Sequence, residues 1–153
     1  MKRVMLCALV ALGLSALKVK AQEFKMSQVS LLVKDYEETL SFYTGSLGFV
    51  KTADMTIGKE RWVTIAPPGQ KGAELVLVKA ETAGDLQAVG KQAGDRTLLV
   101  LETGKFDEIY QQYKDKNVHF ITEVTTRPWG RQAELSDLYG NHLVLLELKP
   151  RPH

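Results

Sequence analysis

The chain has 153 residues, and its 20 Lys and Arg against 18 Asp and Glu side chains give a formal net charge of +2. Residues 1–21 hold four of the basic side chains and no acidic one, so residues 22–153 carry 16 basic and 18 acidic side chains, a net charge of −2. This balance excludes an electrostatic case for nucleic-acid binding, and these 132 residues, which contain no cysteine, are long enough to fold as one domain without disulfides.

The first 21 residues have the layout of a secretory signal peptide. A short basic start, Met1-Lys2-Arg3, precedes an apolar run over residues 4–17, and Ala21 supplies a small residue at a cleavage position. The apolar run is shorter than the roughly 20 residues that span a bilayer. We therefore expect cleavage near Ala21 and a secreted or periplasmic protein without membrane association. Lys18 and Lys20, close to that position, leave an uncleaved anchor as the alternative.

Residues 22–80 contain the pattern of one β-α-β-β-β unit. The helix is predicted to begin at Asp35, whose side chain suits an N-cap, with Glu38 three residues later as the second half of a capping box. The break at Pro67-Pro68-Gly69 separates the last two strands. The four strands are predicted over 28–33, 49–55, 61–66 and 73–78.

A second unit of the same order follows a linker. Residues 80–95 contain three glycines and few large apolar side chains, which predicts the linker. A loop over 127–130 and a turn over 137–141 separate the last strands. The helix of this unit is predicted over 105–116, and its strands over 97–102, 118–124, 131–136 and from the turn to 148.

The two units repeat each other at an offset of seventy residues. Adding seventy takes Tyr43 to Tyr113 on the apolar stripes of the two helices, and takes Glu74 to Val144 in the last strands. This order of helices and strands indicates the α+β class. A pocket between two such units should be lined by equivalent positions from both. We expect a single domain over 22–153, built from two modules, about 26–80 and 96–149, around a pseudo-two-fold axis.

Short segments along the chain resemble those of a known family. These segments are Val33-Lys34-Asp35-Tyr36, Phe42-Tyr43, Leu47-Gly48-Phe49, Arg61-Trp62-Val63, Pro67-Pro68-Gly69, Trp129-Gly130 and Asp137-Leu138-Tyr139-Gly140-Asn141. In order and spacing they resemble the vicinal oxygen chelate superfamily, which contains glyoxalase I, extradiol dioxygenases and bleomycin- and fosfomycin-resistance proteins. The last turn of that family usually reads Asp-Pro-Asp-Gly-Asn, so Leu138 and Tyr139 depart from it.

The resemblance covers nearly all of residues 26–149. It implies two β-α-β-β-β modules that pair into a curved, partly closed mixed sheet with the helices outside. It does not specify an activity, because this fold hosts many.

The resemblance also implies a metal site, which the corresponding residues fit poorly. In the family, four ligands come from equivalent strands of the two modules, and the metal acts as a Lewis acid on vicinal oxygens of the substrate. Gln28 and Glu74 fall on the first-module positions, whereas Leu98 and Val144, which have no donor atom, fall on the second-module positions. His142 could substitute only from about 6–7 Å along the strand. We therefore expect no cofactor, with a divalent metal at the remnants Gln28 and Glu74 as the less favoured alternative.

Two arginines related by the offset of seventy are candidate ligand-binding residues. Arg61 and Arg131 could together clamp a carboxylate or phosphate. In the favoured structural interpretation they are outward strand residues that pair with Glu60 or Glu134.

Two tryptophans and one histidine complete the candidate binding site. Trp62 and Trp129 can stack on a flat ligand, or they can be core or dimer contacts. Trp129 follows a proline in a loop, which makes it the better ligand candidate. His142 is the histidine in a site-like position, with a structural role as its alternative.

The sequence favours an exported protein that binds a small organic molecule. We expect the concave sheet surface to hold this ligand without an obligatory metal, as in the resistance proteins, and we expect a homodimer because members of the family commonly form one. The first alternative is a divalent-metal-dependent lyase or dioxygenase that uses Gln28, Glu74 and His142. The second is a protein-interaction module whose cavity is filled by its own side chains. Whether the protein is an enzyme stays open at this point.

Overall fold

The computed structural model describes residues 24–150, so the predicted signal peptide lies outside the described residues. The first module consists of β1 (Gln28–Val33), α1 (Tyr36–Leu40), the π-helical η1 (Ser41–Ser46), β2 (Val50–Ile57), β3 (Glu60–Ala66) and β4 (Glu74–Lys79). After α2 (Ala83–Ala88), the second module consists of β5 (Thr97–Glu102), α3 (Phe106–Asp115), β6 (Thr125–Arg127), β7 (Gly130–Ser136) and β8 (His142–Leu148). None of the helices in residues 24–150 is long and apolar enough to cross a membrane.

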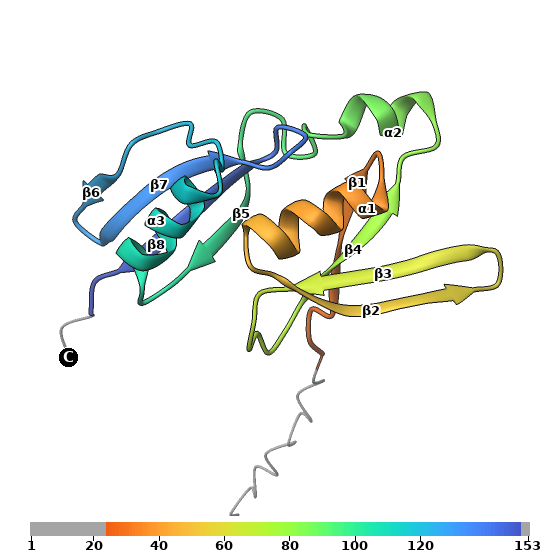
Figure 1. Ribbon diagram of the computed structural model, residues 1–153, viewed down its shortest axis with the longest axis horizontal. Coiled ribbons are helices and arrows are strands. Elements are labelled where there is room, and N and C mark those ends of the chain that lie inside the picture. The colour runs from red at the N-terminus through yellow and green to blue at the C-terminus, as the bar shows by residue number, and fades with distance from the viewer. Residues whose placement is uncertain (1–23, 151–153) are drawn as a thin grey trace, which may run out of the picture.

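The strands form two four-stranded mixed sheets, one for each module. The first sheet has the order β1-β4-β3-β2 and the second the order β5-β8-β7-β6. In each sheet the first pair is parallel and the other two pairs are antiparallel. Figure 1 shows the two modules side by side, with α1 over the first sheet and α3 over the second. The α+β class and the duplicated β-α-β-β-β plan are confirmed.

The first helix begins where the sequence predicts, but its capping box is only half formed. The Asp35 carboxylate accepts hydrogen bonds from the N–H groups of Glu37 and Glu38, both at 2.9 Å. These bonds hold the pKa of Asp35 below its ordinary value. The Asp35 N–H donates at 3.1 Å to the Tyr139 hydroxyl, which itself lies 3.3 Å from the Glu38 carboxylate. A tyrosine of the second module therefore occupies the place that the sequence assigns to Glu38.

The predicted linker contains a short helix. Thr82 accepts a hydrogen bond from the N–H of Asp85 at 3.1 Å, and the Asp85 carboxylate accepts one from the N–H of Thr82 at 3.0 Å. This reciprocal capping box starts α2.

The strand predicted over 118–124 is wrong. The segment makes one isolated bridge, between Phe120 and Leu135, and β6 begins only at Thr125. Both Ile121 and Thr122 donate their N–H groups to the carbonyl of Glu134, at 2.8 and 3.2 Å. Because two consecutive donors share one acceptor, the chain bends here and cannot continue a regular ladder.

One hydrophobic core joins the two modules. Its buried members come from both sheets, from η1 and from α3: Leu31, Val33, Tyr43, Val63, Ile65, Phe106, Tyr113, Leu135, Leu143 and Leu145, among others. The Tyr43 hydroxyl donates to the Asp137 carboxylate at 2.9 Å, and the Tyr113 hydroxyl donates to the carbonyl of Leu47 at 3.0 Å. Burial raises the pKa of Tyr43 far above its ordinary value, and raises the pKa of Tyr113 to about 12. The apolar stripes predicted for the two helices therefore face the core at Tyr43 and Tyr113.

A glutamine side chain covers part of the free edge of β1. Gln92 accepts a hydrogen bond from the N–H of Leu32 at 2.7 Å and donates one to the carbonyl of Ser30 at 3.2 Å. Its amide thus makes the two backbone contacts that a neighbouring strand would make.

Candidate functional site

Each sheet has one face against the helices and one face turned away from them, which we call the open face. Side chains alternate between the two faces of a strand. On β3 the core residues Val63 and Ile65 are fully buried, so Trp62 and Thr64 belong to the open face. On β8 Leu143 and Leu145 are buried in the core, so His142, Val144 and Leu146 belong to the open face.

An apolar row crosses the open face of the first sheet. Met55 pairs with Trp62, and Leu32 pairs with Val78. The β3–β4 register, one step beyond Val63 and Leu77, places Trp62 beside Val78. Met55, Trp62 and Val78 are 51%, 36% and 37% exposed. This row presents hydrocarbon and an indole ring to solvent, a surface on which a flat apolar molecule can stack.

The opposite end of the same face is polar. Gln28 and Glu74 are register partners on β1 and β4. Between the two ends, Thr64 is buried and its hydroxyl lies 2.6 Å from that of Thr52. The first sheet therefore offers an apolar contact at one end and an amide and a carboxylate at the other.

The open face of the second sheet carries a histidine bonded to a carboxylate. His142 Nδ1 lies 2.9 Å from Oε1 of Glu134, and both side chains are about a quarter to a third exposed. Val144 is the register partner of Glu134 on one side and of Val100 on the other. Val100 is 57% exposed. This face thus combines one polar pair with valine side chains.

The strand register changes the position that corresponds to Glu74. Val63 pairs with Leu77 in the first module, and Ala133 pairs with Leu145 in the second. Ala133 comes seventy residues after Val63, but Leu145 comes only sixty-eight residues after Leu77. The cause is a shorter connection, since residues 137–141 replace the longer segment 67–73. By this register Glu74 corresponds to His142, and the predicted correspondence with Val144 is wrong. His142 therefore needs no displacement along the strand to occupy that level.

The residues do not assemble a metal site within one chain. Gln28 and Glu74 lie on the first sheet and His142 lies on the second. Within residues 24–150, no group of three His, Cys, Asp or Glu side chains is placed to hold an ion. Thr97, the register partner of His142, is a poor ligand, and Val100 and Val144 in the next row have no donor atom. The donor set of a single chain does not fit the metal that the fold family implies.

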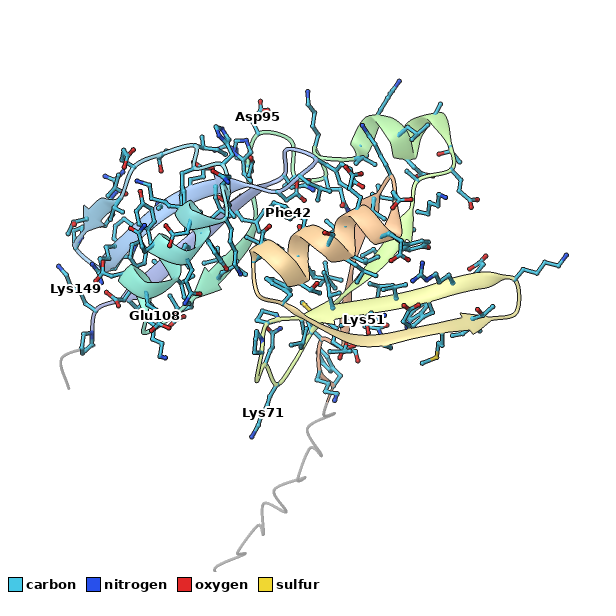
Figure 2. All side chains as sticks on the ribbon, in the orientation of Figure 1. Phe42, Lys51, Lys71, Asp95, Glu108 and Lys149 are labelled. Carbon is cyan, nitrogen blue, oxygen red and sulfur yellow. The ribbon has the colours of Figure 1, made fainter. Side chains whose placement is uncertain are left out.

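The two candidate arginines lie on the helix side of the sheets and are held by carboxylates. Arg61 donates to both oxygens of Asp54 at 2.9 Å and also to Glu37. Asp54 accepts a further bond at 2.8 Å from Lys51, which is labelled on β2 in Figure 2. The hydrogen bonds from Arg61 and Lys51 hold the pKa of Asp54 well below its usual range.

Arg131 repeats this arrangement in the second module. It donates to both oxygens of Asp107 at 2.8 Å and to Glu147 at 2.6 Å. Its carboxylate partners, led by Asp107, raise the pKa of Arg131 above its ordinary value. Neither arginine pairs with Glu60 or Glu134, the partners considered from the sequence. Glu37 and Asp107 are themselves seventy residues apart, so the sequence repeat could have identified them as the partners of Arg61 and Arg131.

Trp129 lies at the end of the second sheet. It occupies the turn between β6 and β7, its side chain is 55% exposed, and its carbonyl accepts from the N–H of Lys149 at 2.8 Å. Trp62 is on the other sheet, and His142 pairs with Ser136 at the end of β7 opposite to Trp129.

A cavity of about 790 Å³ lies between the modules, next to the free edge of β5. The first module lines it with the segment after η1 and the β3–β4 connection, and the second lines it with β5 and α3, including Phe49, Pro67, Val100 and Ile109. Glu108 of α3, labelled in Figure 2, is a polar member of its wall. Since the two modules contribute different elements, the prediction of a pocket lined by equivalent positions is wrong for this cavity.

Comparison with known proteins gives a family and several solved structures. The profile of the Glyoxalase/Bleomycin resistance protein/Dioxygenase superfamily matches residues 25–145. An uncharacterized protein of Shewanella frigidimarina is 33% identical over 125 residues, which cover 80% of this chain and 93% of that protein. The uncharacterized protein YurT of Bacillus subtilis is 34% identical over 128 residues, 80% of this chain and 98% of YurT.

Two solved structures are similar in fold over most of the chain. UcmS2 is 28% identical with a TM-score of 0.72, and covers 82% of this chain and 98% of its own. TnmS3, described as an antibiotic binding protein from Streptomyces sp. CB03234, is 28% identical with a TM-score of 0.69, and covers 83% of this chain and 98% of its own.

Proposed function

We propose that this chain, which belongs to the Glyoxalase/Bleomycin resistance protein/Dioxygenase superfamily, binds a small organic molecule against the open faces of its sheets without an obligatory metal. The observation that carries the proposal is the exposed row of Met55, Trp62 and Val78. Exposed apolar side chains in register on one sheet face are typical of binding surfaces. The similarity to TnmS3, an antibiotic binding protein, supports a ligand of this kind.

We propose further that two copies of the chain form the complete site. In one chain each open face leaves apolar side chains in solvent, with Trp62 and Val78 on the first sheet and Val100 on the second. Apposition of the first sheet of one copy with the second sheet of another would remove these side chains from water. Such a dimer would enclose a ligand between the indole of Trp62 and the Glu134–His142 pair.

Two features of the second sheet's open face support binding without a metal. Val100 and Val144 bring hydrocarbon to the second sheet next to His142, and the Nδ1 of His142 already contacts Glu134.

The competing function is a divalent-metal-dependent lyase or dioxygenase. It is favoured by one observation, the equivalent level of Glu74 and His142, which in a dimer would face each other with Gln28 beside them.

Metal analysis separates these two functions. The purified protein would be assayed for bound metal, and then for thermal shift with added nickel, zinc or manganese. Metal-independent binding predicts no stoichiometric metal and no saturable shift. Stoichiometric uptake that is lost in Glu74→Gln and in His142→Phe would establish the metal-dependent alternative instead.

Tryptophan fluorescence tests ligand binding directly, because the chain has only Trp62 and Trp129. In Trp129→Phe the emission comes from Trp62 alone, and in Trp62→Phe it comes from Trp129 alone. Flat aromatic probes such as methyl 4-hydroxybenzoate should perturb the first variant in a saturable way and leave the second unchanged. Equal responses of the two variants would contradict binding on the open face. A protein-interaction module predicts no saturable response in either.

We also propose export, on the basis of residues 1–21 alone. Mass spectrometry of the protein recovered from the native host tests it. A mature N-terminus near residue 22 in the secreted or periplasmic fraction is the expected result, and an intact Met1 in the cytoplasm would contradict it.

A further inference from the structure

The Glu134–His142 pair is fixed by its surroundings on the second sheet. His142 stands at the start of β8 and pairs in register with Ser136, while Glu134 pairs with Val144 one row further along. The contact between His142 Nδ1 and Glu134 Oε1 measures 2.9 Å. The backbone of Glu134 is held as well, because its N–H donates to the Thr122 hydroxyl at 3.0 Å. The imidazole thus has a defined orientation on a strand of the core sheet.

A carboxylate at Nδ1 determines what the other ring nitrogen can do. An ionised carboxylate only accepts hydrogen bonds, so the neutral imidazole must carry its proton on Nδ1. Nε2 then has a lone pair and no proton, and it acts as an acceptor. Within residues 24–150 no hydrogen bond to Nε2 is formed. Val144 is the register partner of Glu134, and Val100 is the register partner of Val144 on its other side. Covering this face in the proposed dimer would lower the local polarity and strengthen a hydrogen bond made there.

We propose that Glu134 and His142 select ligands that carry a hydroxyl group, with Nε2 of His142 accepting the hydrogen bond of a phenol or an enol. The inference rests on the proposed function, since it concerns a molecule bound on the open faces. In the proposed dimer it assigns the polar half of recognition to the second sheet of one copy and the stacking half to Trp62 on the first sheet of the other copy. A ligand whose hydroxyl is blocked as a methyl ether keeps the apolar contact but has no proton for Nε2.

The tautomer can be measured without any ligand. Long-range ¹H–¹⁵N NMR spectra of the uniformly labelled protein distinguish a protonated Nδ1 from a protonated Nε2. The expected result for the neutral ring of His142 is the Nδ1–H form. In Glu134→Gln the amide can accept from or donate to the ring, so the preference should weaken, whereas Glu102→Gln on the same sheet should leave it unchanged. An Nε2–H tautomer in the wild-type protein would overturn the proposal.

Binding of a matched pair of probes tests the selectivity. Methyl 4-hydroxybenzoate and methyl 4-methoxybenzoate differ only in the hydroxyl proton and one methyl group. The wild-type protein should prefer the phenol by about tenfold, as the net contribution of one hydrogen bond predicts. His142→Phe should abolish the preference, and His142→Gln, whose amide oxygen can accept at a similar place, should keep part of it. Circular dichroism and melting temperature verify that each variant is folded.

The outcomes separate this inference from the proposed function. Equal affinity for the two probes, with both still dependent on Trp62, would refute the role of Glu134 and His142 and leave small-molecule binding intact. Preference for the phenol that persists in His142→Phe would refute it as well. If neither probe binds at millimolar concentration, both the inference and the proposed binding of flat aromatic molecules are contradicted.

Discussion

Arg61 lies over the ring of Tyr36 at 5.3 Å, and Arg131, seventy residues later, lies over the ring of Phe106 at 4.7 Å. Each guanidinium also binds the carboxylate that follows this ring in sequence, Glu37 in the first module and Asp107 in the second. The duplication therefore preserves a complete local arrangement that ties the first turn of a helix to the third strand of its sheet.

The arginine contacts predict a structural role for Arg131. Replacement by alanine should lower the melting temperature by a few degrees, because Asp107 and Glu147 lose their common partner. Binding of a neutral probe on the open face should not change. The measurement is differential scanning fluorimetry of Arg131→Ala, Asp107→Asn and the double variant. If the single losses add fully, the two side chains do not interact and the interpretation fails.

Tyr113 predicts a loss of stability at high pH. Burial raises the pKa of Tyr113 to about 12, above the value of about 10 for an unfolded tyrosine. The folded state therefore favours the neutral phenol. Its contribution is fully present below pH 10 and is lost as the pH rises from about 10 to 12, by roughly 2–3 kcal/mol. Urea unfolding at pH 8 and pH 11.5 should show a smaller loss in Tyr113→Phe than in the wild-type protein. Equal losses in both would contradict this origin.

Gly90 predicts a large effect of a single methyl group. It has a φ of +77°, and a Cβ there would lie 1.9 Å from the carbonyl oxygen of Tyr139. Gly90→Ala should therefore destabilise the protein by more than about 2 kcal/mol. Gly104→Ala is the matched control, because a Cβ at Gly104 meets no atom within 4 Å. Chemical denaturation of both variants is the measurement. Similar midpoints would contradict the prediction, because the backbone at Gly90 would then have moved away from Tyr139 at little cost.

Val78 tests the proposed dimer. It is 37% exposed on the open face, and Leu86 of α2 is 50% exposed elsewhere. A buried unpaired carboxylate is costly, so Val78→Glu should shift the protein to monomers, while Leu86→Glu should not. Multi-angle light scattering over a tenfold range of concentration measures the mass. A Val78→Glu variant that remains as dimeric as the wild-type protein would place the interface on another surface, and a monomeric wild-type protein would exclude the dimer.

Local sequence patterns predicted the strands and helices well where the pattern itself was strong. β1 begins and ends at the predicted residues, and Asp35 caps the first helix as expected. The segment 118–124 has the apolar character of a strand but lacks a regular neighbour, because Ile121 and Thr122 share a single carbonyl. Propensity alone does not contain that information.

The correspondence of site residues between the modules depends on the lengths of the connections, which differ, so a constant offset of seventy misplaces it. The connection after β7 is two residues shorter than the one after β3, so Glu74 corresponds to His142. The partner of His142 was missed because Glu134 is on a different strand and comes eight residues earlier. Such a pair follows from strand register, which is set by turn length.

The amide of Gln92 on β1 has a consequence for association in concentrated solution. A strand from another molecule that added to this edge would first have to displace the contacts to Ser30 and Leu32. Growth of the first sheet into an intermolecular ribbon is therefore obstructed at this segment by a single neutral side chain, which protects the exposed backbone without adding charge to a surface close to the open face.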